Sequence, residues 1–389
     1  MKKSIRTFNK IAQKGLSLFD PSQFSVSDSE ENPSAIVLRS HNLHELSFNS
    51  DLQCIGRAGA GVNNIPVEAC TEKGVVVFNA PGANANAVKE LVFTGMLLSS
   101  RDVVGGINFA KTVQDNGTAF SKQIESNKSR FAGEEIKGKT LGVIGLGAIG
   151  LLVANSAVHL GLKVQGYDPF LSVNRAWELS NAVKPAKSLE KLLAESDFIS
   201  IHVPYSEKTK QFFDDKRLSL FKKGSVLLNF SREGLVDHDA VTEALDKGML
   251  SKYVTDFPSS SLVQHDNVIA IPHLGASTLE AEENCAVMIA NQVKAFLDDG
   301  NITNSVNFPD CSLDRLSRTR LTITNKNVPT IISQVTSILA DNNVNIIEMM
   351  NKSRGDIAYS IIDIEGTISD TVVGSINTID GVMATRHIR

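Results

Sequence analysis

The residues GLGAIG, at positions 145–150, form a glycine-rich turn with the spacing of a dinucleotide-binding motif. An apolar run precedes the turn and a helical pattern follows it. Gly145 would permit the tight turn, Gly147 would let the backbone approach a pyrophosphate, and Gly150 would let the helix pack on the strand. Asp168 ends the next strand, where a carboxylate accepts a hydrogen bond from a ribose 2′-hydroxyl and repels a 2′-phosphate. The pattern predicts NAD rather than NADP, with a turn that merely connects strand and helix as the alternative.

Two further residues directly follow predicted strands of the same region. Arg232 comes after the apolar run SVLLNF, and His273 comes after NVIAIP. Because ligands of open α/β sheets bind outside the carboxyl ends of the strands, both side chains are predicted at the edge that carries the glycine turn. A guanidinium can hold a carboxylate, and an imidazole can take the proton of a 2-hydroxyl while hydride leaves for a nicotinamide. Taken singly, a surface salt bridge for Arg232 and a hydrogen-bonded loop histidine for His273 stay open.

The composition excludes several classes of function. The chain has 389 residues, with 39 lysines and arginines against 43 aspartates and glutamates, so its net charge is −4 and it has no basic run for nucleic acid. It has no stretch of about 18 apolar residues for a membrane, and its N-terminus lacks the apolar core of a secretory signal. We expect a reduced, soluble, cytoplasmic protein. We expect no metal site and no disulfide framework, because the four cysteines are scattered: Cys54, Cys70, Cys285 and Cys311.

The elements that would position these residues alternate short apolar runs with helical patterns in two regions. Such alternation predicts an α/β fold with two doubly wound parallel sheets, each covered by helices on both faces. A long amphipathic helix over 283–300 follows the second region, with Gly300 as its C-cap. The predicted strands include 34–40, 52–61 and 75–82 in the first region, and in the second the strand before the glycine turn, 197–204, 225–234, 252–258 and 267–278.

The pattern changes after a linker at 301–312. Strand, helix, strand, strand, helix and strand follow within about 75 residues, which is the order of a ferredoxin-like split βαβ unit. We place this small domain at 316–389. The first thirty residues carry no clear pattern, so we expect either a disordered lead or a helix docked on the first lobe.

Several motifs, in their order and spacing, make the chain similar to a known family. GLGAIG, YDP, HVP, NFSREGLVD and PHLGAST resemble the D-isomer-specific 2-hydroxyacid dehydrogenases, and the segment that begins GRAGAGVNNIP resembles their substrate domain. The C-terminal unit is similar to an ACT domain. The resemblance implies a substrate-binding lobe of residues 1–95 and 283–305, a Rossmann cofactor lobe of residues 96–282, and a homodimer or homotetramer.

By this resemblance, Arg232 binds the carboxylate and carbonyl of the substrate, and His273 is the general acid and base. The implied cofactor is NAD. The residues implied to line it are Gly145, Gly147, Ala148, Ile149, Gly150, Asp168, His202, Val203, Pro204, Phe230, Ser231, Arg232, Asp256, His273, Leu274, Gly275 and Ala276.

The resemblance also implies a substrate, 3-phosphoglycerate, which would be oxidised to 3-phosphohydroxypyruvate in serine synthesis. Arg39 and Arg57 end two predicted strands and match positions that hold its phosphate, although two ordinary strand-end arginines are the alternative. Ser40, Asn84 and Asn86 are implied beside the substrate. Two other functions stay open: a family member that acts on glyoxylate, hydroxypyruvate or D-lactate, and an NAD-sensing binding protein in which catalysis is incidental.

The sequence departs from the family pattern near the histidine. A glutamate that pairs with this histidine in the family is replaced by Ser261. Such a carboxylate orients the imidazole and raises its pKa. Either another carboxylate, such as Asp266 or Glu280, fills the role, or His273 works unpaired.

A second departure lies in the C-terminal unit. Asn325, Asn327 and Asn345 match the effector region of ACT domains, which implies an amino-acid effector such as L-serine. Thr330 stands where that turn usually has glycine, and a β-branched residue does not adopt positive φ cheaply. Serine regulation and a domain kept for oligomerisation therefore both stay open.

Overall fold

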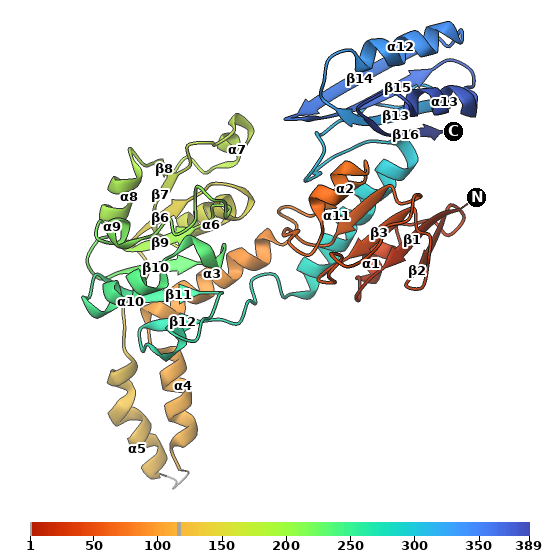
Figure 1. Cartoon of the computed structure of the whole chain (residues 1–389). Coiled ribbons are helices and arrows are strands. Elements are labelled where there is room, and N and C mark those ends of the chain that lie inside the picture. Colours follow the sequence, from red (N-terminus) through yellow and green to blue (C-terminus); the bar gives the residue numbers. More distant parts are fainter. Residues whose placement is uncertain (1, 115–117) are drawn as a thin grey trace. The chain divides into compact units, whose positions relative to one another are not determined.

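The computed structural model describes residues 2–114 and 118–389, which form two compact units (Figure 1). The first unit contains the residues up to Asn84 together with Leu279–Arg389, and the second contains Ala85–Thr278. Each unit contains one of the two predicted parallel sheets, so the predicted α/β class is confirmed. No helix in the described ranges is both long and apolar enough to cross a bilayer.

The first unit contains a parallel sheet with the flavodoxin-like order β2–β1–β3–β4–β5. Alternate residues of its central strands point to opposite faces. Val37 joins the core beneath helix α11, whereas Ile36 joins the core that contains Cys70 of α2. The elements are β1 (Lys3–Thr7), α1 (Gln13–Leu16), β2 (Phe24–Ser27), β3 (Ala35–Leu38), β4 (Cys54–Arg57), α2 (Val67–Glu72), β5 (Val76–Asn79) and α11 (Leu279–Asp299).

The N-terminal thirty residues are not a disordered lead, so that alternative is wrong; they contain a short helix docked on the first unit, as the other alternative expected, together with two strands that were not predicted. β1 and β2 pair in parallel at the edge of the first sheet, and α1 packs against α11. The strands leave little trace in the sequence because they bury few side chains. In β1 only Ile5 is fully buried, and in β2 only Phe24 is.

The second unit contains a seven-stranded sheet in the order β12–β11–β10–β9–β6–β7–β8. All its strands are parallel, and read from β8 the order is that of a Rossmann sheet. Its elements are α3 (Ala85–Ser100), α4 (Val103–Thr112), α5 (Thr118–Asn127), β6 (Thr140–Ile144), α6 (Ala148–His159), β7 (Lys163–Tyr167), α7 (Val173–Glu178), β8 (Lys184–Pro185), α8 (Leu189–Glu195), β9 (Phe198–Ile201), α9 (Asp215–Leu218), β10 (Ser225–Asn229), α10 (His238–Asp246), β11 (Leu250–Thr255) and β12 (Val268–Ala270).

The C-terminal sheet belongs to the first unit and is antiparallel, in the order β14–β15–β13–β16. With its two helices it has the predicted ferredoxin-like βαββαβ order. α12 and α13 cover one face, while Tyr359 and Ile361 on the other face join the core beneath α11. Its elements are β13 (Thr319–Lys326), α12 (Ile331–Asp341), β14 (Ile346–Arg354), β15 (Ile357–Ile364), α13 (Asp370–Asn377) and β16 (Val382–Ile388).

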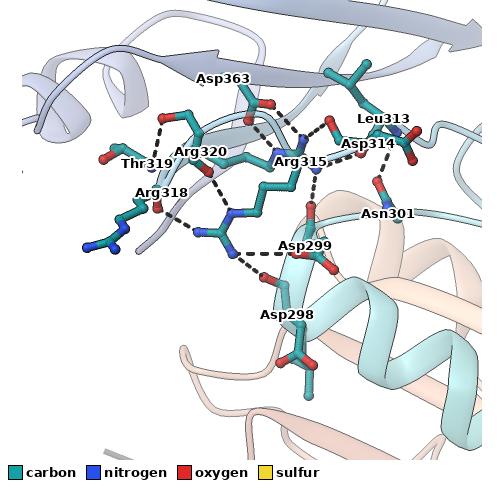
Figure 2. Close-up of polar contacts among 12 residues, drawn as sticks. Asp298, Asp299, Asn301, Leu313, Asp314, Arg315, Arg318, Thr319, Arg320 and Asp363 are labelled. Atoms are coloured by element: carbon teal, nitrogen blue, oxygen red, sulfur yellow. Dashed lines mark hydrogen bonds and ion pairs between the residues drawn. The ribbon is translucent and has the colours of Figure 1, made fainter.

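Side chains of the C-terminal sheet and the segment before it cap the last turn of α11 (Figure 2). The final carbonyl groups of a helix have no partner within it. Here Arg386 donates to the oxygens of residues 296 and 297, Arg315 to that of 298, and Arg320 to that of 299. The Tyr359 hydroxyl donates to the carbonyl of Gly300, at 2.6 Å. The helix end therefore depends on residues that follow it by 15 or more positions.

One of these arginines forms a buried ion pair. Arg320 and Asp363 have no exposed side-chain surface, and their N–O distances are 2.6 and 2.8 Å. Burial alone would raise the pKa of Asp363, but hydrogen bonds from Arg320 and the Leu316 amide outweigh it and hold that pKa below its usual value. The pair joins β13 to β15, and its arginine also reaches α11.

The cysteines bear on redox and metal chemistry. All four are free and buried. Burial raises the pKa of Cys54 and of Cys70 to about 12, so neither thiol is a ready nucleophile or metal ligand. Across the described residues, no group of three or more His, Cys, Asp or Glu side chains could hold a metal ion.

Candidate active site

Six strands of the second sheet end at one edge, and each is followed by a residue of the predicted site. All the strands are parallel, so their carboxyl ends meet there. Neighbouring connections diverge between β6 and β9, which is where a dinucleotide binds in such sheets. The order along the edge is His273 after β12, Asp256 after β11, Arg232 after β10, His202 after β9, the glycine turn after β6, and Asp168 after β7.

The glycine turn is built for a close backbone approach. A Cβ on Gly150 would lie 1.9 Å from the carbonyl oxygen of Gly145, so no other residue fits there. A Cβ on Gly147 would meet nothing within 4 Å, and no side chain caps the start of α6, where Ala148 and Ile149 are the first residues. The first N–H groups of α6 and the positive end of its dipole are therefore suited to a pyrophosphate.

Asp168 is tied to the glycine turn through its carboxylate. Oδ2 accepts a hydrogen bond from the Leu146 amide and Oδ1 accepts one from the Phe170 amide, both at 2.9 Å. A carboxylate has about four acceptor positions, so a ribose hydroxyl can still donate to it. Asp168 can therefore shape the turn as well as bind the cofactor.

His202 is a neutral histidine at the foot of the turn. Its amide donates to the carbonyl of Ile144 at 2.7 Å, and its Nε2 lies 2.8 Å from the Ser200 hydroxyl. The residue is half-buried, but its Nδ1 is shielded from solvent and has no partner among the described residues. This burial lowers the pKa of His202 to about 3, so the imidazole is neutral at pH 7. Val203 and the exposed Pro204 continue this wall.

Arg232 is held by its own strand rather than by a carboxylate. Its Nη1 donates to the Ser231 carbonyl at 2.6 Å, and its own carbonyl accepts from the Asn229 amide at 3.0 Å. Ser231 in turn donates to the carbonyl of Ile201, and Phe230 is buried. Within the described ranges no carboxylate lies at ion-pair distance from Arg232. The guanidinium therefore keeps donors for a carboxylate ligand.

The loop that carries His273 is clamped by Asp256. The buried Asp256 carboxylate accepts from the amides of Leu274 and Gly275, at 2.7 and 2.8 Å. The amide of His273 donates to the Asp256 carbonyl, and φ at His273 is +54°. Burial raises the pKa of Asp256, partly offset by those amides and by His273. Ala276 follows, half-buried.

The imidazole of His273 contacts an aromatic ring rather than a carboxylate. The ring centroids of His273 and Phe257 are 5.1 Å apart, and the rings are edge to face. In the part of the chain that the structure describes, no carboxylate, including that of Asp266, is hydrogen-bonded to this imidazole. Ser261 precedes a short 3₁₀ turn, and Glu280 belongs to the other unit.

Two predicted substrate residues meet at the carboxyl ends of β3 and β4. Arg57 ends β4, and its Nε donates to the carbonyl of Arg39 at 3.1 Å. A Cβ on Gly59 would lie 1.6 Å from Nη1 of Arg57, so this glycine leaves room for the guanidinium. Arg39 forms an ion pair with Glu282 on α11, at 2.8 Å. The structure thus brings both arginines together in the first unit.

The remaining predicted substrate residues are distributed over both units. Ser40 is exposed on the loop after β3. Asn84 is the last residue of the N-terminal segment of the first unit, whereas Asn86 lies on α3 in the second unit. The Asn86 amide is engaged by two side chains of its own helix, Lys89 and Glu90.

The three predicted effector asparagines are each engaged within the C-terminal domain. Asn325 donates to the next residue's carbonyl at 2.7 Å, Asn327 to the Gly355 carbonyl at 3.0 Å, and Asn345 to the Glu365 carboxylate at 3.0 Å. The Oδ1 of Asn325 is buried and lacks a partner among the described residues. No two of these amides share a partner.

Sequence reasoning missed Glu282 and Phe257. Glu282 is one of two acidic residues in the first turn of α11, a common place for carboxylates, so its type alone gave no signal. Phe257 directly follows Asp256, but its contact with His273 depends on the loop after the neighbouring strand.

Known proteins that resemble this chain include members of the family that the sequence motifs indicate. The family model described as "D-isomer specific 2-hydroxyacid dehydrogenase, NAD binding domain" matches residues 103–275. The chain is 33% identical over 348 residues to D-3-phosphoglycerate dehydrogenase of Methanocaldococcus jannaschii, covering 86% of this chain and 63% of that protein. It therefore spans less than two thirds of that relative. It is also 33% identical over 347 residues to D-3-phosphoglycerate dehydrogenase of Haemophilus influenzae, covering 86% of this chain and 81% of that protein.

Solved structures share the fold. NAD⁺-bound 3-phosphoglycerate dehydrogenase of Entamoeba histolytica has a TM-score of 0.62 and 24% identity, covering 79% of this chain and 99% of that one. The holo form of Rhodotorula graminis D-mandelate dehydrogenase has a TM-score of 0.67 and 22% identity, covering 80% and 99%.

Proposed function

This chain belongs to the D-isomer specific 2-hydroxyacid dehydrogenase family, and from that premise we propose that it oxidises D-3-phosphoglycerate to 3-phosphohydroxypyruvate, a step in serine synthesis. The observation that carries the proposal is the sheet edge on which Arg232 and His273 follow β10 and β12, on the same side as the uncapped start of α6. Relatives named D-3-phosphoglycerate dehydrogenase support the choice of substrate.

The family's cofactor is NAD, and the residues of this edge fit it. The open turn at Gly147 and the free amides of α6 suit its pyrophosphate, and Asp168 suits a ribose hydroxyl. NAD, when bound, accepts a hydride from the substrate carbon. The loop of Leu274, Gly275 and Ala276 would border the cofactor at the other end of the edge.

Arg232 and His273 divide the work on the 2-hydroxy acid. Arg232 would hold the substrate carboxylate with the N–H donors that the Ser231 carbonyl does not use. A ring nitrogen of His273 would take the proton of the 2-hydroxyl as the hydride leaves the same carbon, and later pass that proton to water. Asp256 would keep the loop, and so the imidazole, in place.

The phosphate would be bound by the arginine pair of the first unit. Arg39 and Arg57 provide two permanent positive charges next to one another, which suits a phosphate monoester. Ser40, Asn84 and Asn86 are proposed as additional contacts to the substrate.

The C-terminal βαββαβ domain would be an ACT-type domain that takes an amino-acid effector such as L-serine. Its topology supports this assignment. So does the turn at Thr330, which has the left-handed backbone of a glycine turn, with φ of +74°.

One assay tests the proposed activity. NADH formation would be followed at alkaline pH with D-3-phosphoglycerate, D-glycerate and D-lactate in parallel, with and without L-serine. We expect turnover of the phosphorylated acid alone, because the paired arginines favour a substrate with a phosphate.

Each other outcome points to a different function. Turnover of D-glycerate or D-lactate instead would identify a family member that acts on unphosphorylated acids. No turnover of any acid, with NAD still bound, would identify an NAD-sensing protein and overturn the proposal.

A further inference from the structure

The arginine pair of the first unit includes a carboxylate. Arg39 and Arg57 follow neighbouring parallel strands, β3 and β4. The carbonyl of Arg39 accepts hydrogen bonds from Arg57 Nε and from the Asn64 side chain, both at 3.1 Å. These bonds fix the main chain at Arg39 next to the guanidinium group of Arg57. The side chain of Arg39 is fixed by Glu282, whose Oε1 lies 2.8 Å from its Nη1.

The carboxylate comes from the first turn of a long and well-anchored helix. α11 packs its buried face on the first sheet and is capped at its far end by the C-terminal sheet. The same charges act on the buried thiol of Cys285, which lies one turn after Glu282. Burial raises the pKa of this thiol, the charges of Arg57 and Arg39 oppose that rise, and the charge of Glu282 adds to it. The hydrogen bond from Arg57 to the Arg39 carbonyl and the ion pair between Arg39 and Glu282 therefore join two guanidinium groups and one carboxylate in a single cluster.

The charge of this cluster is lower than the arginines alone would give. Two guanidinium groups carry +2, and Glu282 reduces this to +1. A phosphate monoester carries about −1.5 to −2 at pH 7. The Arg39 and Glu282 side chains are 35% and 39% exposed, so the ion pair is only partly screened by water. A phosphate that binds Arg39 must compete with Glu282 and meet its repulsion.

Building on the proposed function, we propose that Glu282 is a specificity-determining residue that competes with the substrate phosphate for Arg39. It holds the guanidinium in place while the site is empty and weakens the binding of every anion there. A ligand displaces Glu282 only if its own interaction with the arginines is stronger than the Arg39–Glu282 ion pair. The site therefore favours a phosphate dianion bound by both arginines over a singly charged group bound by one.

The test compares two adjacent glutamates. Glu282→Gln removes the charge but keeps the shape, and Glu283→Gln is the matched control, because Glu283 pairs with Lys14 at 3.0 Å instead. Each full-length variant is loaded with NADH, so no turnover occurs and NADH binding reports the fold. D-3-phosphoglycerate and inorganic phosphate are then titrated in by calorimetry.

We expect Glu282→Gln to tighten the binding of D-3-phosphoglycerate about tenfold, because residue 282 would no longer repel the phosphate or compete for Arg39. Glu283→Gln should match the unchanged protein. Equal or weaker binding by Glu282→Gln would overturn the role of Glu282 and leave the substrate assignment intact. If no protein binds D-3-phosphoglycerate while all bind NADH, the proposed function fails as well.

Discussion

At the scale of single residues, the active-site histidine owes its position to the backbone. His273 has a left-handed φ of +54°, which a residue with a Cβ adopts only when its surroundings demand it. The surroundings here are the Asp256 carbonyl, which takes the His273 amide, and the Asp256 carboxylate, which takes the next two amides. In this way Asp256 holds the imidazole through the main chain, without a hydrogen bond to its ring.

Replacing this histidine tests its chemistry. His273→Ala should lower turnover of the substrate by about a hundredfold or more, since general acid–base catalysis contributes roughly that factor. NADH binding, measured by fluorescence titration, should persist because the glycine turn and Asp168 lie at the other end of the edge. Turnover within a few-fold of the unchanged protein would remove His273 from the proton transfer.

The sequence predicts where a single residue lies when its position relative to one strand is enough to place it. Arg232 and His273 could be placed because each directly follows a buried strand, and parallel strands share an edge. Glu282 could not, because its partner Arg39 is separated from it by more than 240 positions and meets it only after α11 has packed on the first sheet. The roles of these residues in substrate binding stay predictions.

At the scale of elements, α12 begins after a residue with an unusual backbone conformation. Thr330 precedes the helix with a φ of +74°, in the left-handed region. A residue with a Cβ pays about 1–2 kcal/mol for this backbone. The turn therefore has a backbone shape that glycine adopts more easily, although its residue is threonine. Two side-chain hydrogen bonds compensate in part: the Ser333 hydroxyl donates to the Thr330 carbonyl, and the Gln334 side-chain amide donates to Thr330 Oγ1.

A glycine at position 330 should relieve this strain. Thr330→Gly should stabilise the start of α12 by about 0.5–1 kcal/mol, because the strain removed exceeds the added freedom of glycine in the unfolded chain. Amide hydrogen exchange of the peptide 326–341 should slow by about two- to fivefold. Thr330→Ala is the control, since alanine keeps the Cβ. Faster exchange in the glycine variant would show that the hydroxyl bond matters more than the strain.

Element prediction was accurate where strands are buried on both faces. The three apolar runs of the first lobe gave β3, β4 and β5, although each observed strand is shorter than its run because the ends turn into loops. β1 and β2 were missed because an edge strand can be polar on most positions, so its pattern does not differ from that of a loop.

At the scale of the whole molecule, the first unit depends on a buried charge. The pKa of Asp363 is below its usual value, so its charge stabilises the fold above its unfolded pKa, near 4, and that contribution is lost as pH falls through the folded value. Its partner Arg320 has no exposed side-chain surface and also caps α11. As pH falls below the usual aspartate pKa, the stability that this pair contributes to the first unit is therefore progressively lost.

Asp363→Asn should destabilise the first unit by about 3–5 kcal/mol at pH 7, because it leaves Arg320 buried without a counter-charge. Differential scanning calorimetry of the full chain should show the lowered transition, and the gap to the unchanged protein should narrow below about pH 4. Asp314→Asn is the matched control, since Asp314 offers Arg320 only its main-chain carbonyl. An unchanged transition in Asp363→Asn would show that the pair contributes no net stability.

Residues of the C-terminal part of the chain cap the end of α11, so this part cannot be removed without exposing the last carbonyl groups of the helix. If the chain were cut after residue 313, the carbonyl oxygens at the end of α11 would lose Arg315, Arg320, Tyr359 and Arg386 together. Of the side-chain donors to the last turn, Lys3, which donates to the Leu297 carbonyl at 2.9 Å, would remain, and the core beneath α11 would lose the residues of the C-terminal sheet. A shortened dehydrogenase made from this protein would need a new terminus designed for that helix, and a transplanted C-terminal domain would have to bring its own set of cations.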